Sequence, residues 1–111
     1  MDLQTKQEKN AIVVSISGRL DAVTAPEYEK AMRELIESGS SHFVIDFEQL
    51  EYISSAGLRV LLLIAKLLKK KEGRVCLASI NGNVRSVFDM SGFFSIFQVE
   101  DSVAVALASF I

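Results

Sequence analysis

The sequence contains very few of the residues that catalysis, metal binding and disulfide bonding usually need. Its one cysteine, Cys76, excludes an internal disulfide, indicates a reducing compartment and is interpreted as a small buried hydrophobe. Its one histidine, His42, excludes a metal site built from several histidines. A nucleophile–base pair of Cys76 and His42 is the remaining alternative. Both residues lie in or beside predicted strands, so we do not expect catalysis there.

Membrane-spanning, nucleotide-binding and nucleic-acid-binding patterns are also missing. Residues 1–10 are polar without a signal-peptide pattern, and the longest apolar stretch, 58–68, is too short to cross a bilayer. Neither a P-loop lysine pattern nor a dinucleotide-binding glycine fingerprint occurs. The formal net charge of -2 gives no nucleic-acid footprint, and the basic run Lys69–Lys71 fits the last turn of a helix. The sequence therefore predicts a soluble, cytoplasmic protein that binds no cofactor, nucleic acid or membrane.

The chain is hydrophobic enough to build a core, since 50% of its 111 residues are apolar, and no linker or repeat divides residues 1–111. Short β-branched runs alternate with segments of helical spacing. We predict strands at 3–8, 11–16, 43–47, 74–79 and 95–99, and helices between Thr24 and Gly39 and at 55–71, 83–90 and 102–110. This order predicts a single α/β domain with a four- to five-stranded mixed sheet. We expect about four helices, mainly on one face of that sheet.

Several residues are predicted to mark where these elements begin and end. Thr24 and Glu27 have the spacing of a capping box at the start of the first helix. Gly18 is predicted to end the second strand, and Asp101 to cap the last helix. Residues 48–53 are predicted to form a loop that leads into the second helix.

Residues 54–58 place two hydroxyl groups where the second helix must begin. In the simpler interpretation, Ser54 or Ser55 is only an N-cap, which contributes about 1 kcal/mol. In the functional interpretation, a phosphate on Ser55 would meet the free N–H groups and the positive end of the helix dipole. A hydrolase nucleophile at Ser55 would need a glycine in place of Ile53 and a suitably placed histidine. We therefore predict that the protein is not an enzyme.

The predicted helix over 55–71 has more apolar residues than one buried face requires. The residues beyond that face are Val60, Leu63, Ile64 and Leu67. A helix on the outside of a sheet usually keeps one polar side. Either neighbouring helices cover the excess, or part of it forms a docking patch for a protein partner.

Four short motifs resemble those of the STAS domain, which anti-sigma-factor antagonists share with the cytoplasmic tails of sulphate transporters. They are Gly18–Asp21, Val44–Phe47 followed by Leu50 and Ile53, Ser55–Leu58, and Val87–Gly92. Their order and spacing match the family over nearly the whole chain, and the bacterial anti-anti-sigma factors are the most similar members.

The resemblance implies a partner-switching mechanism without any cofactor bound to this chain. The unphosphorylated antagonist would bind an anti-sigma factor that is also a serine kinase with bound Mg-ATP, and so release a sigma factor. The kinase would then phosphorylate Ser55 and dissociate, and a PP2C-type phosphatase would reset the cycle. The residues implied at the partner surface are Asp21, Ser54, Ala56, Gly57, Leu58 and Arg59. Ser54 stands where many members carry aspartate.

Two further expectations accompany this resemblance. Asp21, Asp46, Glu48 and Glu51 are expected near the start of the second helix, where an added phosphate would meet an already acidic surface. The alternative function is that of a constitutive small STAS subunit in a lipid ABC transporter complex, which would need no phosphorylated serine.

Overall fold

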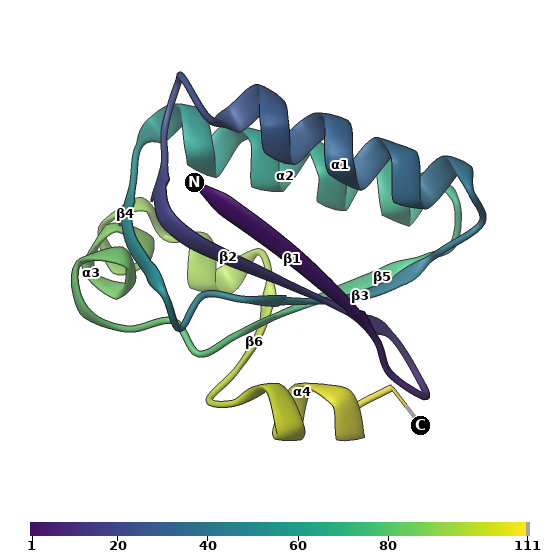
Figure 1. Cartoon of the computed structure of the whole chain (residues 1–111). Helices are drawn as coiled ribbons and strands as arrows, with labels where there is room; N and C mark the ends of the chain where they lie inside the picture. Colours follow the sequence, from purple (N-terminus) through teal and green to yellow (C-terminus); the bar gives the residue numbers. More distant parts are fainter. Residues whose placement is uncertain (111) are drawn as a thin grey trace.

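The computed structural model describes residues 1–110, which form one mixed sheet with helices on both faces (Figure 1). Ile111, the last residue of the predicted single unit, lies outside the described residues. The strands are β1 (Asp2–Gln7), β2 (Ile12–Leu20), β3 (His42–Asp46), β4 (Leu50–Ile53), β5 (Arg74–Ala78) and β6 (Gln98–Glu100). The helices are α1 (Ala25–Glu37), α2 (Ser55–Lys70), α3 (Gly82–Ser91) and α4 (Val103–Ala108), with a 3-10 turn over Phe93–Ser95.

The sheet confirms the predicted mixed topology, and its first two strands form an antiparallel pair. The strand order is β1-β2-β3-β5-β6, and β4 pairs with the carboxyl end of β2. β1 runs antiparallel to β2, whereas every other recorded pair among the described residues is parallel. Parallel neighbours need crossover connections, and α1 between β2 and β3 and α2 between β4 and β5 lie in two of them.

β2 is longer than predicted because Gly18 does not end it. Gly18 has a φ of +83°, a conformation that glycine adopts without steric cost, and the strand continues to Leu20. Beyond this point β2 pairs with β4, and the register shifts between Gly18 and Arg19. The predicted loop over 48–53 therefore contains a strand, which raises the sheet to six strands within residues 1–110.

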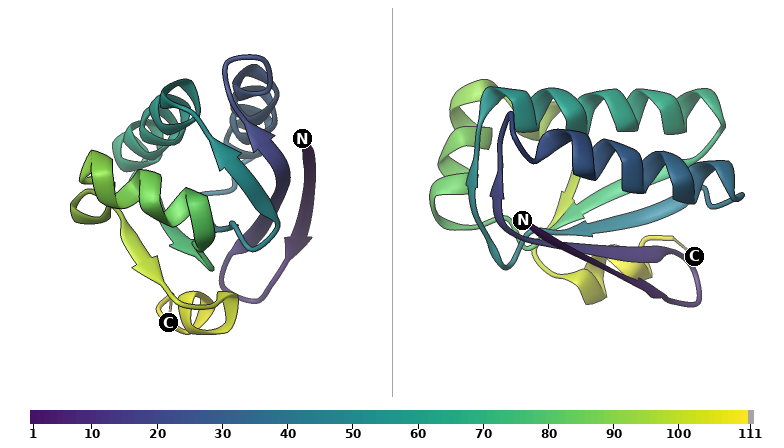
Figure 2. Two further views of the ribbon diagram at one scale, coloured as in Figure 1. Left: turned by 90° about the vertical axis from the view of Figure 1, so that its left-hand side faces the viewer. Right: turned by 45° about the horizontal axis from the view of Figure 1, so that its top comes forward.

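Two layers of apolar side chains hold the helices on opposite faces of the sheet. α1 and α2 lie together on one face, α4 lies on the other, and α3 flanks β4 (Figure 2). Alternate strand residues supply the two layers, as expected for a period of two. The main layer includes Ile12, Val14, Ile16, Phe43, Ile45 and Leu77. The smaller layer, beneath α4, consists of Ala11, Val13, Val44, Cys76, Ala78 and Ala106.

The predicted start of α1 at Thr24 is confirmed, but the capping box predicted there and the predicted Asp101 cap of α4 are wrong. The Thr24 hydroxyl donates to the backbone oxygen of Arg19 (2.8 Å) and accepts from the N–H of Asp21 (2.9 Å), so it does not cap α1. The cap of α4 is Ser102, whose hydroxyl accepts from the N–H of Val105 (3.1 Å), instead of Asp101. α3 ends at Gly92, which is its C-cap in the left-handed conformation.

Candidate functional site

The predicted site lies where the carboxyl ends of β2 and β4 meet. These strands are parallel, and their last residues, Leu20 and Ile53, pair with each other. The backbone N–H of Ser54 donates to the backbone oxygen of Leu20 (3.0 Å). The loop that enters α1 and the first turn of α2 are therefore neighbours (Figure 1). Carboxyl ends of parallel strands commonly carry function, because the loops beyond them gather at one edge.

Ser54, and not Ser55, caps α2. Its backbone is extended, and its hydroxyl accepts from the N–H of Gly57 (3.3 Å). Ser55 is the first helical residue and its side chain is exposed. The N–H groups of Ser55 and Ala56 have no recorded acceptor among residues 1–110. The Ser55 hydroxyl thus stands beside two open amide donors and has no role in holding the helix start.

Replacing Ser54 by Ala is expected to destabilise the fold by about 1 kcal/mol, because the Gly57 amide loses its acceptor. Ser55→Ala is the matched control and is expected to change the unfolding free energy by less than about 0.5 kcal/mol, since its side chain is exposed and caps nothing. Urea denaturation of the two variants measures the difference. Equal losses would show that the capping role is shared.

Two of the residues that the family resemblance implies at the partner surface, Gly57 and Leu58, are buried. Leu58 is 7% exposed, and Gly57 is buried against β2. A Cβ added to Gly57 would lie 2.5 Å from the backbone oxygen of Leu20 and 2.8 Å from a side-chain carbon of Ile53. These residues hold the start of α2 tightly against the sheet. The other predicted site residues reach the surface: Ser55 and Arg59 are exposed, and Asp21, Ser54 and Ala56 are partly exposed.

The structure places an arginine–tyrosine pair beside the site that the sequence alone does not reveal. The Arg19 guanidinium lies 4.1 Å from the centre of the Tyr52 ring, and its Nε donates to Asp21 (3.4 Å). A parallel pairing of the strands that carry Arg19 and Tyr52 would have revealed this contact, but β4 was predicted as a loop. Val23, in the adjoining loop, is 84% exposed. The surface beside Ser55 therefore mixes charge with exposed apolar groups.

Asp21 organises the loop that borders the site. Its carboxylate accepts from the N–H groups of Val23 (3.0 Å) and Thr24 (3.2 Å). The hydrogen bond from the Thr24 N–H, with smaller contributions from Val23 and Arg19, lowers the pKa of Asp21 below its ordinary value. The carboxylate is therefore charged at neutral pH, as the acidic surface predicted for this region requires.

The prediction that Asp46 and Glu48 also border the helix start is wrong. Both line a shallow hollow with β1 residues and Val103, the first residue of α4. They precede β4, and α2 begins only after that four-residue strand, which spans about 13 Å. Asp46 instead accepts from the Ser15 hydroxyl (3.2 Å) on β2. Of the four predicted acids, Asp21 is the one that the described contacts bring to the loop beside α2.

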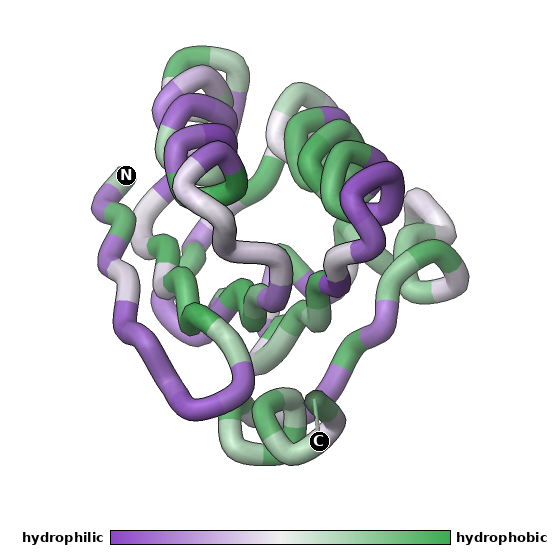
Figure 3. Tube along the Cα trace, turned by 90° about the vertical axis from the view of Figure 1, so that its right-hand side faces the viewer, coloured by the Kyte–Doolittle hydropathy of each residue, from purple (hydrophilic) through white to green (hydrophobic). Residues whose placement is uncertain are grey.

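Neighbouring elements cover most of the apolar excess on α2. Val60 and Ile64 are 6% and 1% exposed, and α1 packs along α2. Leu63 remains 38% exposed. In Figure 3 the trace of α2 is mostly hydrophobic and that of α1 mostly hydrophilic, in agreement with the deeper burial of α2. The first of the two alternatives thus holds for most of this helix.

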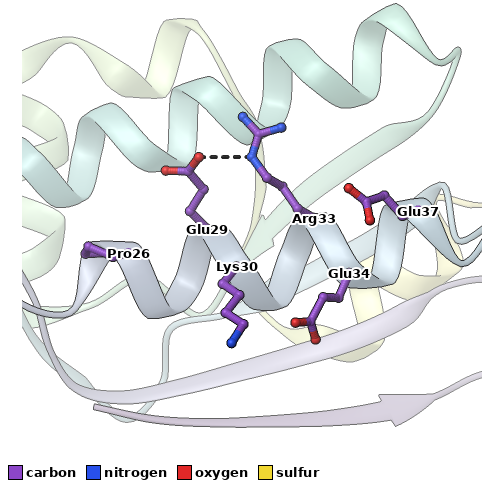
Figure 4. Close-up of a pocket in the computed structure, with 6 residues that line it drawn as sticks. All are labelled: Pro26, Glu29, Lys30, Arg33, Glu34 and Glu37. Atoms are coloured by element: carbon purple, nitrogen blue, oxygen red, sulfur yellow. Dashed lines mark hydrogen bonds and ion pairs between the residues drawn. The ribbon is translucent and has the colours of Figure 1, made fainter.

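The described residues contain neither a metal-binding cluster nor a membrane-spanning helix. Among residues 1–110, no group of three or more His, Cys, Asp and Glu side chains could hold a metal ion. No helix over the same residues is long and apolar enough to span a bilayer. A hollow along α1 is lined only by side chains of that helix, where Glu29 and Arg33 form an ion pair of 2.9 Å (Figure 4).

Comparison with known proteins decides the family of this chain. Residues 2–106 match the family model described as STAS domain. The chain belongs to the STAS domain family. In this STAS domain, two of the four sequence motifs meet at the site, because Gly18–Asp21 ends β2 and Ser55–Leu58 opens α2. The other two serve the framework: Val44–Phe47 lies at the centre of the sheet, and Val87–Gly92 ends α3.

Similar STAS proteins are named as anti-sigma factor antagonists. BtrV of Bordetella bronchiseptica, provisionally given that name, is 36% identical over 110 residues, covering 99% of this chain and 95% of BtrV. The anti-sigma F factor antagonist of Paenibacillus polymyxa is 33% identical over 110 residues, covering 96% and 94%.

Solved structures show the same fold. A protein of Thermotoga maritima, provisionally named an anti-sigma factor antagonist, superposes with a TM-score of 0.90 at 20% identity, covering 97% of this chain and 93% of the other. The Bacillus cell fate determinant SpoIIAA in its phosphorylated form gives a TM-score of 0.74 at 21% identity, covering 97% and 98%.

Proposed function

We propose that this STAS domain is an anti-sigma factor antagonist that is switched by phosphorylation of Ser55. The observation that carries the proposal is the exposed Ser55 side chain at the first residue of α2, next to a cap that Ser54 supplies. The names of the 36% and 33% identical relatives support the function. The phosphorylated form of the Bacillus protein supports the type of modification.

The proposed partner is an anti-sigma factor that is itself a serine kinase. Its bound ATP would supply the γ-phosphoryl group, the Ser55 oxygen would attack it, and ADP would leave. Mg²⁺ and the base that takes the hydroxyl proton would belong to the kinase, so this chain needs no catalytic group or cofactor of its own. A PP2C-type phosphatase would hydrolyse the phosphoserine and reset the switch. Because the cycle uses ATP, its proposed setting is the cytoplasm.

The position of Ser55 explains how the modification could change binding without changing the fold. The Ser55 hydroxyl makes no recorded hydrogen bond within residues 1–110, and the α2 cap belongs to Ser54. A phosphate there adds about -1.5 to -2 charges beside a helix N-terminus, where the dipole favours them. The same charges would face a partner surface that fits a neutral serine, where burying them is costly.

Phosphorylation by the cognate anti-sigma factor kinase tests the proposal directly. Incubation with that kinase and ATP is expected to add one phosphate, which intact-mass spectrometry detects, and Ser55→Ala is expected to abolish the addition. Ser54→Ala is the matched control, because it removes the adjacent hydroxyl and should still accept one phosphate. Phosphate on Ser55→Ala would contradict the assignment. Binding to an ABC ATPase that is indifferent to Ser55→Ala would favour the transporter-subunit alternative.

A further inference from the structure

Arg59 differs from the other arginines in having no recorded partner. The sequence contains five arginines, and four of them are held by neighbours within residues 1–110. Arg19 contacts Asp21 and Tyr52, and Arg33 pairs with Glu29. Arg74 donates to Gln98 and Ser109, and Arg85 donates to Ile80 and lies over Phe94. Arg59 makes no ion pair, side-chain hydrogen bond or cation–π contact with any described residue.

The unpaired charge of Arg59 lies one helical turn after Ser55 on α2. The two residues are four apart on α2, so their side chains lie on the same face one turn from each other, and both are exposed. α2 contains no Asp or Glu along its 16 residues, so no acid on its own helix competes for the guanidinium.

We propose that Arg59 holds the phosphate when Ser55 is phosphorylated, which rests on the proposed function. An anion at position i with a cation at i+4 is the favourable orientation on a helix. Guanidinium binds phosphate oxygens through two parallel N–H donors, which an ammonium group does not do. Arg19, the other arginine beside the site, is already engaged by Asp21 and Tyr52.

This arrangement makes the phosphate change the surface in two ways. It adds negative charge at Ser55, and it withdraws the Arg59 guanidinium from contact with a partner. In the unphosphorylated protein, the Arg59 guanidinium is exposed and has no ion pair within residues 1–110, so it remains available to a partner.

The second ionisation of the phosphate measures the interaction without any partner protein. Phosphoserine is incorporated at position 55 by genetic encoding, and the phosphorus NMR shift is titrated through the second pKa, near 6. Arg59→Gln is expected to raise that pKa by about 0.2 to 0.4 units at low salt, because the cation that favours the dianion is gone. The effect should shrink at about 1 M salt. Arg59→Lys should restore part of the shift, since it keeps the charge and loses the paired donors.

Lys66→Gln is the matched control, because it removes one positive charge from the same helix, seven residues and about 10 Å further along. It is expected to leave the phosphate pKa nearly unchanged. Equal titration curves for the parent, Arg59→Gln and Lys66→Gln phosphoproteins would overturn the proposal. Because the phosphoserine is encoded genetically, the titration does not depend on any kinase. A failure of Arg59 to hold the phosphate and a failure of the proposed function are therefore separate outcomes.

Discussion

Phosphoserine at position 55 is expected to lower the affinity for the cognate anti-sigma factor kinase by about 100- to 1,000-fold. A dianion facing a surface built for a neutral side chain costs several kcal/mol, and each 1.4 kcal/mol is about tenfold in affinity. Ser55→Asp carries one charge on a shorter side chain, so a smaller loss of about tenfold is expected. Isothermal titration calorimetry of the parent, the aspartate variant and the encoded phosphoprotein measures the series.

Ser38→Asp is the control for charge alone. Ser38 is exposed and follows the last residue of α1, whereas the loop beside Ser55 enters the other end of that helix. The 13 residues of α1 separate the two positions by about 20 Å. This variant should bind the kinase as the parent does. Full affinity of the phosphoprotein at position 55 would contradict the switch, whatever the kinase reaction shows.

Gly57→Ala is expected to destabilise the protein by about 2 kcal/mol, although alanine is the better helix former. The new methyl would lie 2.5 Å from the Leu20 backbone oxygen, which cannot move without displacing β2. For a chain of this length, the loss corresponds to a fall in melting temperature of roughly 10 °C. Thermal and urea denaturation measure the change.

Both groups that oppose this methyl are held in place. The Leu20 carbonyl, 2.5 Å away, belongs to the backbone, and the Ile53 Cγ1, 2.8 Å away, belongs to a side chain that is 2% exposed. A Gly57→Ala variant as stable as the parent would show that α2 can lift from β2 at no cost. The site would then be less rigidly positioned than its packing indicates.

The strands that cross the middle of the sheet could be predicted because their residues are apolar on both sides. Val44 and Cys76 face α4 while Phe43, Ile45 and Leu77 face α1 and α2, so both segments read as continuous hydrophobic runs. β4 could not be found in this way. Its two central residues, Glu51 and Tyr52, are both exposed, and only its ends are buried.

The sequence does not determine which of several neighbouring polar residues caps a helix. Ser54 and Ser55, Asp101 and Ser102, and Thr24 with its capping-box partner all have suitable chemistry. Tertiary contacts make the selection: the Arg19 carbonyl and the Asp21 N–H occupy the Thr24 hydroxyl. For the candidate site, the sequence located Ser55 at a helix start, but the neighbouring Arg19–Tyr52 contact depended on the pairing of β2 with β4.

Cys76, in the smaller apolar layer beneath α4, is a natural chemical probe of how firmly that helix is held. Cys76 is fully buried there, and burial, with a smaller contribution from Glu100, raises the pKa of its thiol to about 11. α4 has six residues. The backbone oxygen of Ser109, the next residue, accepts a hydrogen bond from the Arg74 guanidinium (2.8 Å). A thiol reagent can reach the sulfur only when this short helix detaches. Because Cys76 is the one cysteine in the sequence, the rate at which the reagent labels the protein measures how often α4 detaches from its face of the sheet.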